Sequence, residues 1–424
     1  MSADADLARH VPLLLNRARA LLRLPGGPSD RLAPNEIAPA ARAVDALHLG
    51  LVGDRTLARP ETYDERQALG AYLLWWWPQS YVKTRAALQL LPEGTLERGR
   101  VLDLGSGPGP AALAALDATW APEVVALDAS GAALDEAKAI ATGMPLSVRH
   151  WKLGKGPLPL LPDDRYQLVT AANLLSELPG APLERAALIA DVIDRHLSPG
   201  GIFLALEPAL RETGRELLEV RDRLLELGLR ALAPCFTQGP CPALASGKDW
   251  CTASQVWEPP EHVRQLADAT GLRADELLSF APLAVARSAP ATDPAVFRVV
   301  GVPRPEKGKS RAFVCGVPGR DAVVLLEKHR TEANGALLDV SHGDLVRLGG
   351  LERKGDGWRL KPESRVERLE DRGAPPFAGA LVALGAPAND DAHVQEHAHE
   401  DRHEHAREDE HGSAAEGSAD RDAD

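Results

Sequence analysis

Short apolar strands and amphipathic helices alternate along residues 99–228, and this alternation constrains the fold more than any other feature of the sequence. Strands are predicted at Arg100–Leu104, Glu123–Leu127, Leu146–Trp151 and Tyr166–Ala171 and in GIFLALEP. Helices are predicted between them, at Pro110–Trp120, Ala132–Thr142 and Pro182–Leu197 and in ALRETGRELLEVRDRLLELG. A strand that is followed by a helix usually returns to a parallel neighbour. The pattern therefore predicts an α/β fold whose mostly parallel sheet is covered on both faces.

A glycine-rich loop follows the first of these strands. In VLDLGSGPGPAALAAL, Asp103 precedes Gly105, Gly107 and Gly109, and a helix begins at once. Glycines let the backbone turn sharply and approach a ligand closely. The next strand ends in Asp128, where a carboxylate can accept hydrogen bonds from a ribose diol. The register of these parts favours a nucleotide-type cofactor site over the alternative, a glycine turn that binds nothing.

Polar residues also follow the fourth strand, in TAANLLSELPG. Asn173, Ser176 and Glu177 would lie near the expected cleft, and they could equally cap the next helix. The stretch has no Asn-Pro-Pro-Tyr-like element for amino-group methylation. The sequence therefore predicts a binding site here and leaves the catalytic residues unknown.

Three of the four cysteines lie together in PCFTQGPCPALASGKDWC, and the fourth lies far downstream in RAFVCGVPG. They are Cys235, Cys241, Cys251 and Cys315. Zinc sites usually have two ligands two to four residues apart, and no spacing here is that short. Ligand spacing varies more in iron–sulfur sites. Clustering of three cysteines argues against four unrelated buried thiols. A disulfide pair is the weakest interpretation, because structural disulfides are rare in cytosolic proteins.

These motifs together resemble one family. DLGSGPG resembles motif I of the class I S-adenosylmethionine-dependent methyltransferases. With the LEP of the fifth strand, the C-x5-C-x9-C insert, Trp257 and GVPRPEKGKSRAFVCGVPG, the chain resembles the methyltransferase-like assembly factors of the mitochondrial small ribosomal subunit and their bacterial relatives. The resemblance runs from about Tyr72 to about Leu360.

The resemblance implies cofactors and a partner for this chain. Asp103 would face the methionine end of S-adenosylmethionine and Asp128 its ribose. In that family four cysteines ligate a [4Fe–4S] cluster, and they map onto Cys235, Cys241, Cys251 and Cys315 here. The partner implied is the small ribosomal subunit with its ribosomal RNA.

Basic residues gather around the last cysteine, within short alternating runs that predict a small β-domain. They are Arg304, Lys307, Lys309, Arg311, Arg320, Lys328 and Arg330. Together with the resemblance, Lys307, Lys309 and Arg311 are predicted to contact RNA phosphates, which dominate RNA affinity. Taken alone, a solvated strand face would explain them equally well.

The remaining chain completes the predicted organisation. Residues 1–97 read as helical, with Pro78 expected to break or restart a helix and Trp75, Trp76 and Trp77 covering every face of a turn. We expect a methyltransferase-like domain at 98–290 with the cysteine insert at 234–257, a small β-domain at 291–385 and a disordered acidic, histidine-rich tail at 386–424. The tail carries most of the net charge of −13, so the rest of the chain is close to neutral. The acidic net charge therefore does not exclude a nucleic-acid-binding surface on the rest of the chain.

The start of the chain does not read as a signal peptide, and no apolar run reaches the roughly 18 residues of a membrane span. We therefore expect a cytoplasmic, monomeric protein that does not bind membranes. Two functions fit the residues. One is a small-subunit-associated protein that binds S-adenosylmethionine and an iron–sulfur cluster, with or without methyl transfer. The other is a small-molecule methyltransferase with a structural zinc site.

Overall fold

The computed structural model describes residues 3–53, 60–119, 121–152, 158–274, 276–355 and 357–369. All of them belong to the first of the two units into which the chain divides, Met1–Gly379. The tail predicted to be disordered lies outside the described residues.

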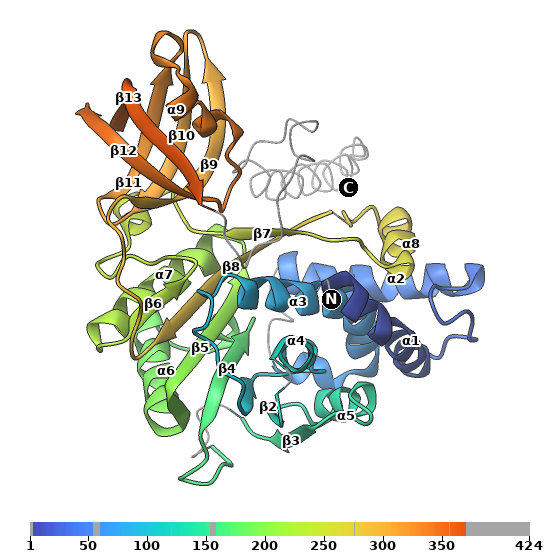
Figure 1. Ribbon diagram of the computed structural model, residues 1–424. Coiled ribbons are helices and arrows are strands. Elements are labelled where there is room, and N and C mark those ends of the chain that lie inside the picture. The colour runs from blue at the N-terminus through green and yellow to red at the C-terminus, as the bar shows by residue number, and fades with distance from the viewer. Residues whose placement is uncertain are drawn as a thin grey trace, which may run out of the picture. The chain divides into compact units, whose positions relative to one another are not determined.

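An eight-stranded sheet forms the centre of this unit (Figure 1). Its strands are β1 (Val101–Leu104), β2 (Val124–Asp128), β3 (Leu146–His150), β4 (Tyr166–Ala172), β5 (Leu197–Pro208), β6 (Arg230–Ala233), β7 (Ala253–Val256) and β8 (Leu277–Ala286). Strands β3, β2, β1, β4 and β5 are parallel neighbours, and β8 runs antiparallel between β5 and β6, with β7 also paired to it. This is the class I methyltransferase fold, and it confirms the predicted α/β class.

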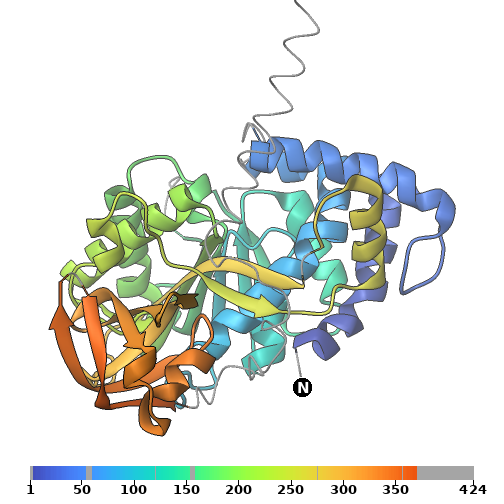
Figure 2. The ribbon, with the colours of Figure 1, turned by 90° about the horizontal axis from the view of Figure 1, so that it is seen from above.

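Helices cover both faces of the sheet (Figures 1 and 2). They are α1 (Ala3–Leu22), α2 (Pro34–His48), α3 (Arg66–Gln89), α4 (Pro110–Thr119), α5 (Gly131–Ile140), α6 (Pro182–His196), α7 (Arg211–Glu226) and α8 (Glu261–Thr270). Alternate side chains of each strand point to opposite faces. Val101 and Val124 therefore pack in one core with α1 to α4, whereas Leu102 and Val125 pack in the other with α6 and α7.

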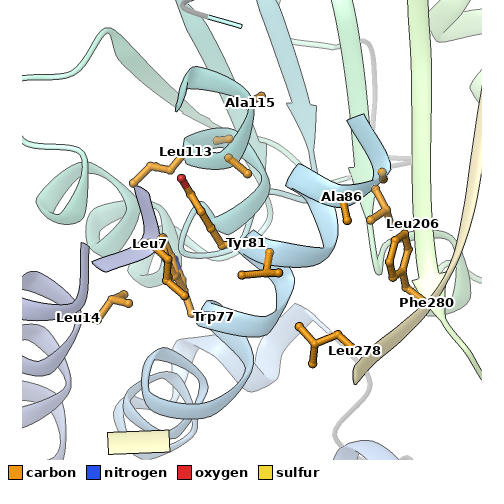
Figure 3. Packing of buried hydrophobic residues seen from close by; sticks show 14 of the residues in the cluster. Leu7, Leu14, Trp77, Tyr81, Ala86, Leu113, Ala115, Leu206, Leu278 and Phe280 are labelled. Atoms are coloured by element: carbon orange, nitrogen blue, oxygen red, sulfur yellow. The ribbon is translucent and has the colours of Figure 1, made fainter. Parts of the chain in front are cut away.

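Helix α3 runs unbroken through Pro78, so the prediction that Pro78 breaks or restarts a helix is wrong. A proline inside a helix costs about 3 kcal/mol. Each large apolar side chain that is fully buried contributes about 1.5–3 kcal/mol, and α3 buries many on all sides. Figure 3 shows Trp77 and Tyr81 among side chains of α1 and α4, and Ala86 beside Leu206 and Phe280. Tertiary packing therefore outweighs the local cost.

The five strands after the sheet close into a barrel in the order β10-β11-β13-β12-β9. They are β9 (Val296–Glu306), β10 (Lys309–Gly316), β11 (Gly319–Leu326), β12 (Leu345–Lys354) and β13 (Gly357–Leu369), with a short helix, α9 (Glu332–Gly335), before β12. Phe297, Val314, Val323 and Leu360 fill the barrel interior. The predicted small β-structure is present.

Among the described helices, none is both long and apolar enough to cross a membrane.

Candidate functional site

The glycine loop lies between the end of β1 and the start of α4. Gly105, Gly107 and Gly109 have φ angles of 65°, 53° and 83°, in the left-handed region that side-chain-bearing residues rarely adopt. A Cβ added at Gly107 would meet no atom within 4 Å, whereas one at Gly105 would lie 2.6 Å from Leu174 Cδ1. Gly105 thus permits close packing on the loop after β4, and Gly107 leaves open space for a ligand.

Asp103 lies one residue before the end of β1 and is fully buried. Its Oδ1 accepts a hydrogen bond of 2.6 Å from Thr170 Oγ1, while its Oδ2 has no well-formed hydrogen bond within the described residues, although the Ser106 hydroxyl and the Ala112 N–H approach the carboxyl. Burial is the main cause that raises the pKa of Asp103 to about 6. A buried acceptor without a well-formed hydrogen bond is costly unless a ligand supplies a donor.

Asp128 at the end of β2 holds the loop from the other side. Its Oδ2 accepts from the Gly107 N–H at 2.7 Å and its Oδ1 from the Ser130 N–H at 2.8 Å. Burial raises the pKa of this carboxyl above its usual range. Each carboxylate oxygen has a second lone pair, so Asp128 can accept further hydrogen bonds while it fixes the loop.

Aromatic side chains from the N-terminal helices reach the same loop. The Trp77 indole Nε1–H donates to the Pro108 carbonyl at 2.9 Å. The rings of Tyr63 and Tyr72 meet edge to face, with centroids 5.3 Å apart. Burial, with the negative charges of Glu177 and Asp128 nearby, raises the pKa of both phenols, that of Tyr72 to about 12. Both phenols therefore stay neutral near Glu177 and Asp128, and the Tyr72 hydroxyl lies 3.5 Å from Ser80 Oγ. No sequence motif marks these tyrosines.

The turn after β4 has a strained residue and a buried acid that holds it. Asn173 has a φ angle of 56°, and its N–H donates to the Leu206 carbonyl at 2.7 Å. Glu207, at the end of β5, accepts from the backbone N–H groups of Leu175 and Ser176 at 2.8 and 3.3 Å. Burial is the main cause that raises the pKa of Glu207 to about 7. Such strain persists only where the surroundings impose it, and it is concentrated at functional sites.

The four cysteines line one cavity of about 40 Å³ between the loop after β6 and strand β10. Its wall is otherwise largely apolar, from Leu217, Phe236 and Leu283 among others. None of the four thiols forms a disulfide. Burial is the main cause that raises the pKa of Cys251 to about 11 and that of Cys315 to about 12. The structure thus brings all four predicted ligands to one enclosed place.

Three arginines line the same cavity, and sequence reasoning missed their role. They are Arg221 of α7, Arg298 of β9 and Arg320 of β11. Arg221 is almost fully buried, with its Nη2 3.5 Å from Cys235 Sγ. Arg298 donates to the Pro234 carbonyl of the cysteine loop at 2.5 Å, which connects the barrel to that loop.

The thiols in this cavity are not arranged as a ready-made metal site. No three His, Cys, Asp or Glu side chains of the described residues are grouped closely enough to hold a metal ion. The three guanidinium groups around the four thiols would nevertheless balance the negative charge of a metal centre held by several thiolates.

Comparison with known proteins places these features in one family. The profile described as mitochondrial small ribosomal subunit Rsm22 matches residues 66–359, more than half of the sequence. The chain belongs to the Rsm22 family. The matched span includes the glycine loop, the four cysteines and most of the barrel. None of the curated proteins matches the chain.

Solved structures of methyltransferases are similar to this Rsm22-family chain over about half of its length. The ribosomal protein L11 methylase of Lactobacillus delbrueckii subsp. bulgaricus is 19% identical, with 49% of this chain and 80% of that chain covered and a TM-score of 0.29. The S-adenosylmethionine-dependent methyltransferase of Mesorhizobium loti is 18% identical, covering 49% and 97%, with a TM-score of 0.30. The putative methyltransferase complexed with the Trm112 activator in Haloferax volcanii is 17% identical, covering 50% and 91%, with a TM-score of 0.31.

The basic residues predicted to contact RNA lie at the turn from β9 to β10 in this Rsm22-family barrel. Lys307 is exposed in the turn itself. Lys309 Nζ and Arg311 Nε lie 2.8 and 3.2 Å from the carboxylate of Glu306. Two of the three predicted cations are therefore already paired within the hairpin, and RNA contact stays a prediction.

Proposed function

We propose that this chain is a methyltransferase-like protein that binds S-adenosylmethionine and associates with the small ribosomal subunit. One observation carries the proposal. The Rsm22 family match extends continuously from α3 through an intact cofactor loop into the barrel. The match supports ribosome association, and the loop geometry supports cofactor binding.

S-adenosylmethionine fits the groups around the loop. The open space at Gly107 would admit the cofactor beside the backbone. The Oδ2 of Asp103 would accept from its ammonium group, and the spare lone pairs of Asp128 would accept from its ribose hydroxyls. When bound, the cofactor supplies an electrophilic methyl group. The neutral phenols of Tyr63 and Tyr72 would donate hydrogen bonds on the same side of the loop.

The cysteine cavity would hold a [4Fe–4S] cluster. Metal binding deprotonates thiols whose burial otherwise keeps them neutral, and it couples to folding. Arg221, Arg298 and Arg320 would offset the charge of the resulting thiolates. The cluster would link the loop after β6 to β10 of the barrel, which carries Cys315.

Contact with the small subunit is proposed to include its ribosomal RNA, through the barrel that carries Lys307, Lys309 and Arg311. Sedimentation of purified ribosomal subunits with the full chain tests the association. We expect the chain to travel with small subunits and not with large ones. Sedimentation with neither subunit, by a folded chain that binds S-adenosylmethionine, would contradict the ribosomal part of the proposal alone.

A further inference from the structure

The barrel has the plan of an OB-fold. Its five strands close in the order β9-β10-β11-β13-β12, with β11 and β13 parallel and all other neighbours antiparallel. A short helix, α9, stands between the third and fourth strands. OB-fold barrels bind oligonucleotides or oligosaccharides on the face of their second and third strands and at the loops beside it. In this chain those strands are β10 and β11.

Strand register shows which side chains share that outer face. Directly paired residues point to the same side of a sheet, and successive residues point to opposite sides. Ala312 and Val314 point into the barrel, so Arg311, Phe313 and Cys315 point outward.

The pairings extend these three positions into rows across the face. Arg304, Arg311, Val324 and Arg359 form one row. Gly301, Phe313 and Ala322 form the second row, and Arg298, Cys315 and Arg320 form the third. The first row carries three arginines; Arg311 is paired with Glu306, and beyond Arg359 the row continues to Glu352. The second row carries Phe313. The third row reaches the cysteine cavity.

Phe313 is an exposed platform in the middle row. Its side chain is 38% exposed, although a phenylalanine on a barrel would normally be buried. Its paired neighbours are Gly301, which has no side chain, and Ala322, whose side chain is a single methyl group, so neither covers the ring. Bases stack on such rings with little regard to sequence, because every base has a π-face.

The charge of the barrel suits a polyanion. Residues 296–369 contain 15 Lys or Arg and 10 Asp or Glu, whereas the whole chain has a net charge of −13. Arg304, Lys307 and Arg359 have no ion pair with any described residue. Unpaired cations in the row beside an aromatic platform and in the adjoining turn can contact successive phosphates.

We infer that this outer face binds a single-stranded RNA segment, with a base stacked on Phe313 and phosphates at Arg304, Lys307 and Arg359. The inference rests on the proposed association with the small subunit, whose RNA would supply the segment. A single strand is required because a duplex keeps the faces of its bases stacked inside and unavailable to Phe313.

Fluorescence anisotropy with the full chain tests the platform. The probe is a labelled oligouridylate of about 10 nucleotides, within the length that one such barrel covers. We expect Phe313→Ala to weaken binding about tenfold or more, and Phe313→Trp to restore it. Leu227→Ala is the matched control, because Leu227 is also an exposed apolar residue but lies at the end of α7, and it should bind like the wild type.

The row of arginines has its own test in a salt series. Arg304→Gln and Arg359→Gln should each weaken binding and reduce the salt dependence by about one counterion. Arg365→Gln is the control, because Arg365 is exposed on the same strand β13 but pairs with Gly349 of β12. S-adenosylmethionine binding should be unchanged in all of these variants, which shows that they are folded.

Two outcomes would overturn the inference. One is equal affinity of wild type and Phe313→Ala for the oligouridylate. The other is tighter binding of an RNA duplex than of the single strand. If the chain travels with small subunits but binds no oligouridylate, the inference fails while the proposed function stands. If Phe313→Ala loses the subunits without any change in RNA affinity, the face binds a protein instead.

Discussion

Gly105 and Gly107 share a left-handed backbone but differ in what a side chain would meet. A methyl group at either position costs on the order of 1 kcal/mol of backbone strain. At Gly105 it would also collide with Leu174, whereas at Gly107 it would enter open space. We expect Gly105→Ala to lower the melting temperature clearly more than Gly107→Ala. Gly107→Ala should instead mainly weaken S-adenosylmethionine binding, as titration calorimetry would show. If Gly107→Ala and the wild type bind S-adenosylmethionine equally tightly, the ligand does not occupy the space beside Gly107.

The buried carboxyl of Asp103 lowers the stability of the folded chain at neutral pH, and we propose that it also binds the cofactor. Its pKa is raised to about 6 in the folded state, so the folded chain binds the extra proton between about pH 4 and 6. Stability therefore falls as pH rises through this window, and the penalty is complete above it. We expect Asp103→Asn to abolish that slope in melting temperature. The same change should weaken S-adenosylmethionine binding about 10- to 100-fold, because a hydrogen bond to a charged group is lost. A variant with lower stability at neutral pH and normal cofactor affinity would contradict both roles.

The sequence alone was enough to predict those site residues whose position follows from a nearby motif. Asp103 lies within β1 and Asp128 is the last residue of β2, and the order of strands and glycines in the sequence predicted both positions. Glu207 lay in the LEP motif, but nothing local shows that its carboxylate holds the turn after β4. The arginines of the cysteine cavity come from three separate elements, and only the folded chain brings them together.

Among the elements, α3 shows how packing replaces a lost helical bond. Pro78 has no N–H for the carbonyl of Leu74. The imidazole of His262 in α8 approaches that carbonyl without a well-formed hydrogen bond. Most strands and helices from β1 to α7 were predicted to within about two residues, but β5 begins four residues before the predicted GIFLALEP strand, and β6, β7, β8 and α8 were not predicted. The continuity of α3 could not be predicted, because it depends on contacts with α1, α4 and β8.

Burial of His262 should make the α3–α8 contact sensitive to acid. Burial lowers its pKa from 6.5 to about 4, so the unfolded chain binds more protons between these values. The stability that neutral His262 contributes is complete above pH 6.5 and is lost as pH falls towards 4, by on the order of 3 kcal/mol. We expect His262→Leu to flatten this part of the pH–stability curve. The control His150→Gln, at an exposed position of β3, should leave the curve as it is. Parallel curves for wild type and His262→Leu would refute the assignment.

On the scale of the whole molecule, the cysteine cavity is lined by residues of both the sheet region and the barrel. Three ligands come from the loop after β6 and one from β10, so metal binding would stabilise both together. We expect the chain purified without oxygen to contain about four iron and four sulfide per molecule. Cys315→Ser should lose most of both and melt earlier. A colourless protein with one zinc per chain would show a zinc site instead.

The cavity arginines give this account a second test. Arg320→Gln should lower iron retention under mild chelation, because one positive charge beside the thiolates is lost. Arg365→Gln, at an exposed position of β13 that does not line the cavity, should retain iron like the wild type. Equal retention by both variants would mean that Arg320 serves only its ion pair with Asp249.

The most direct test of the central claim is titration calorimetry of S-adenosylmethionine into the folded full chain. The account predicts saturable binding at one site, strongly weakened by Asp128→Ala and unaffected by Phe313→Ala. Absence of binding by the wild type, even at millimolar cofactor, would contradict the claim that this methyltransferase fold is a cofactor-binding one.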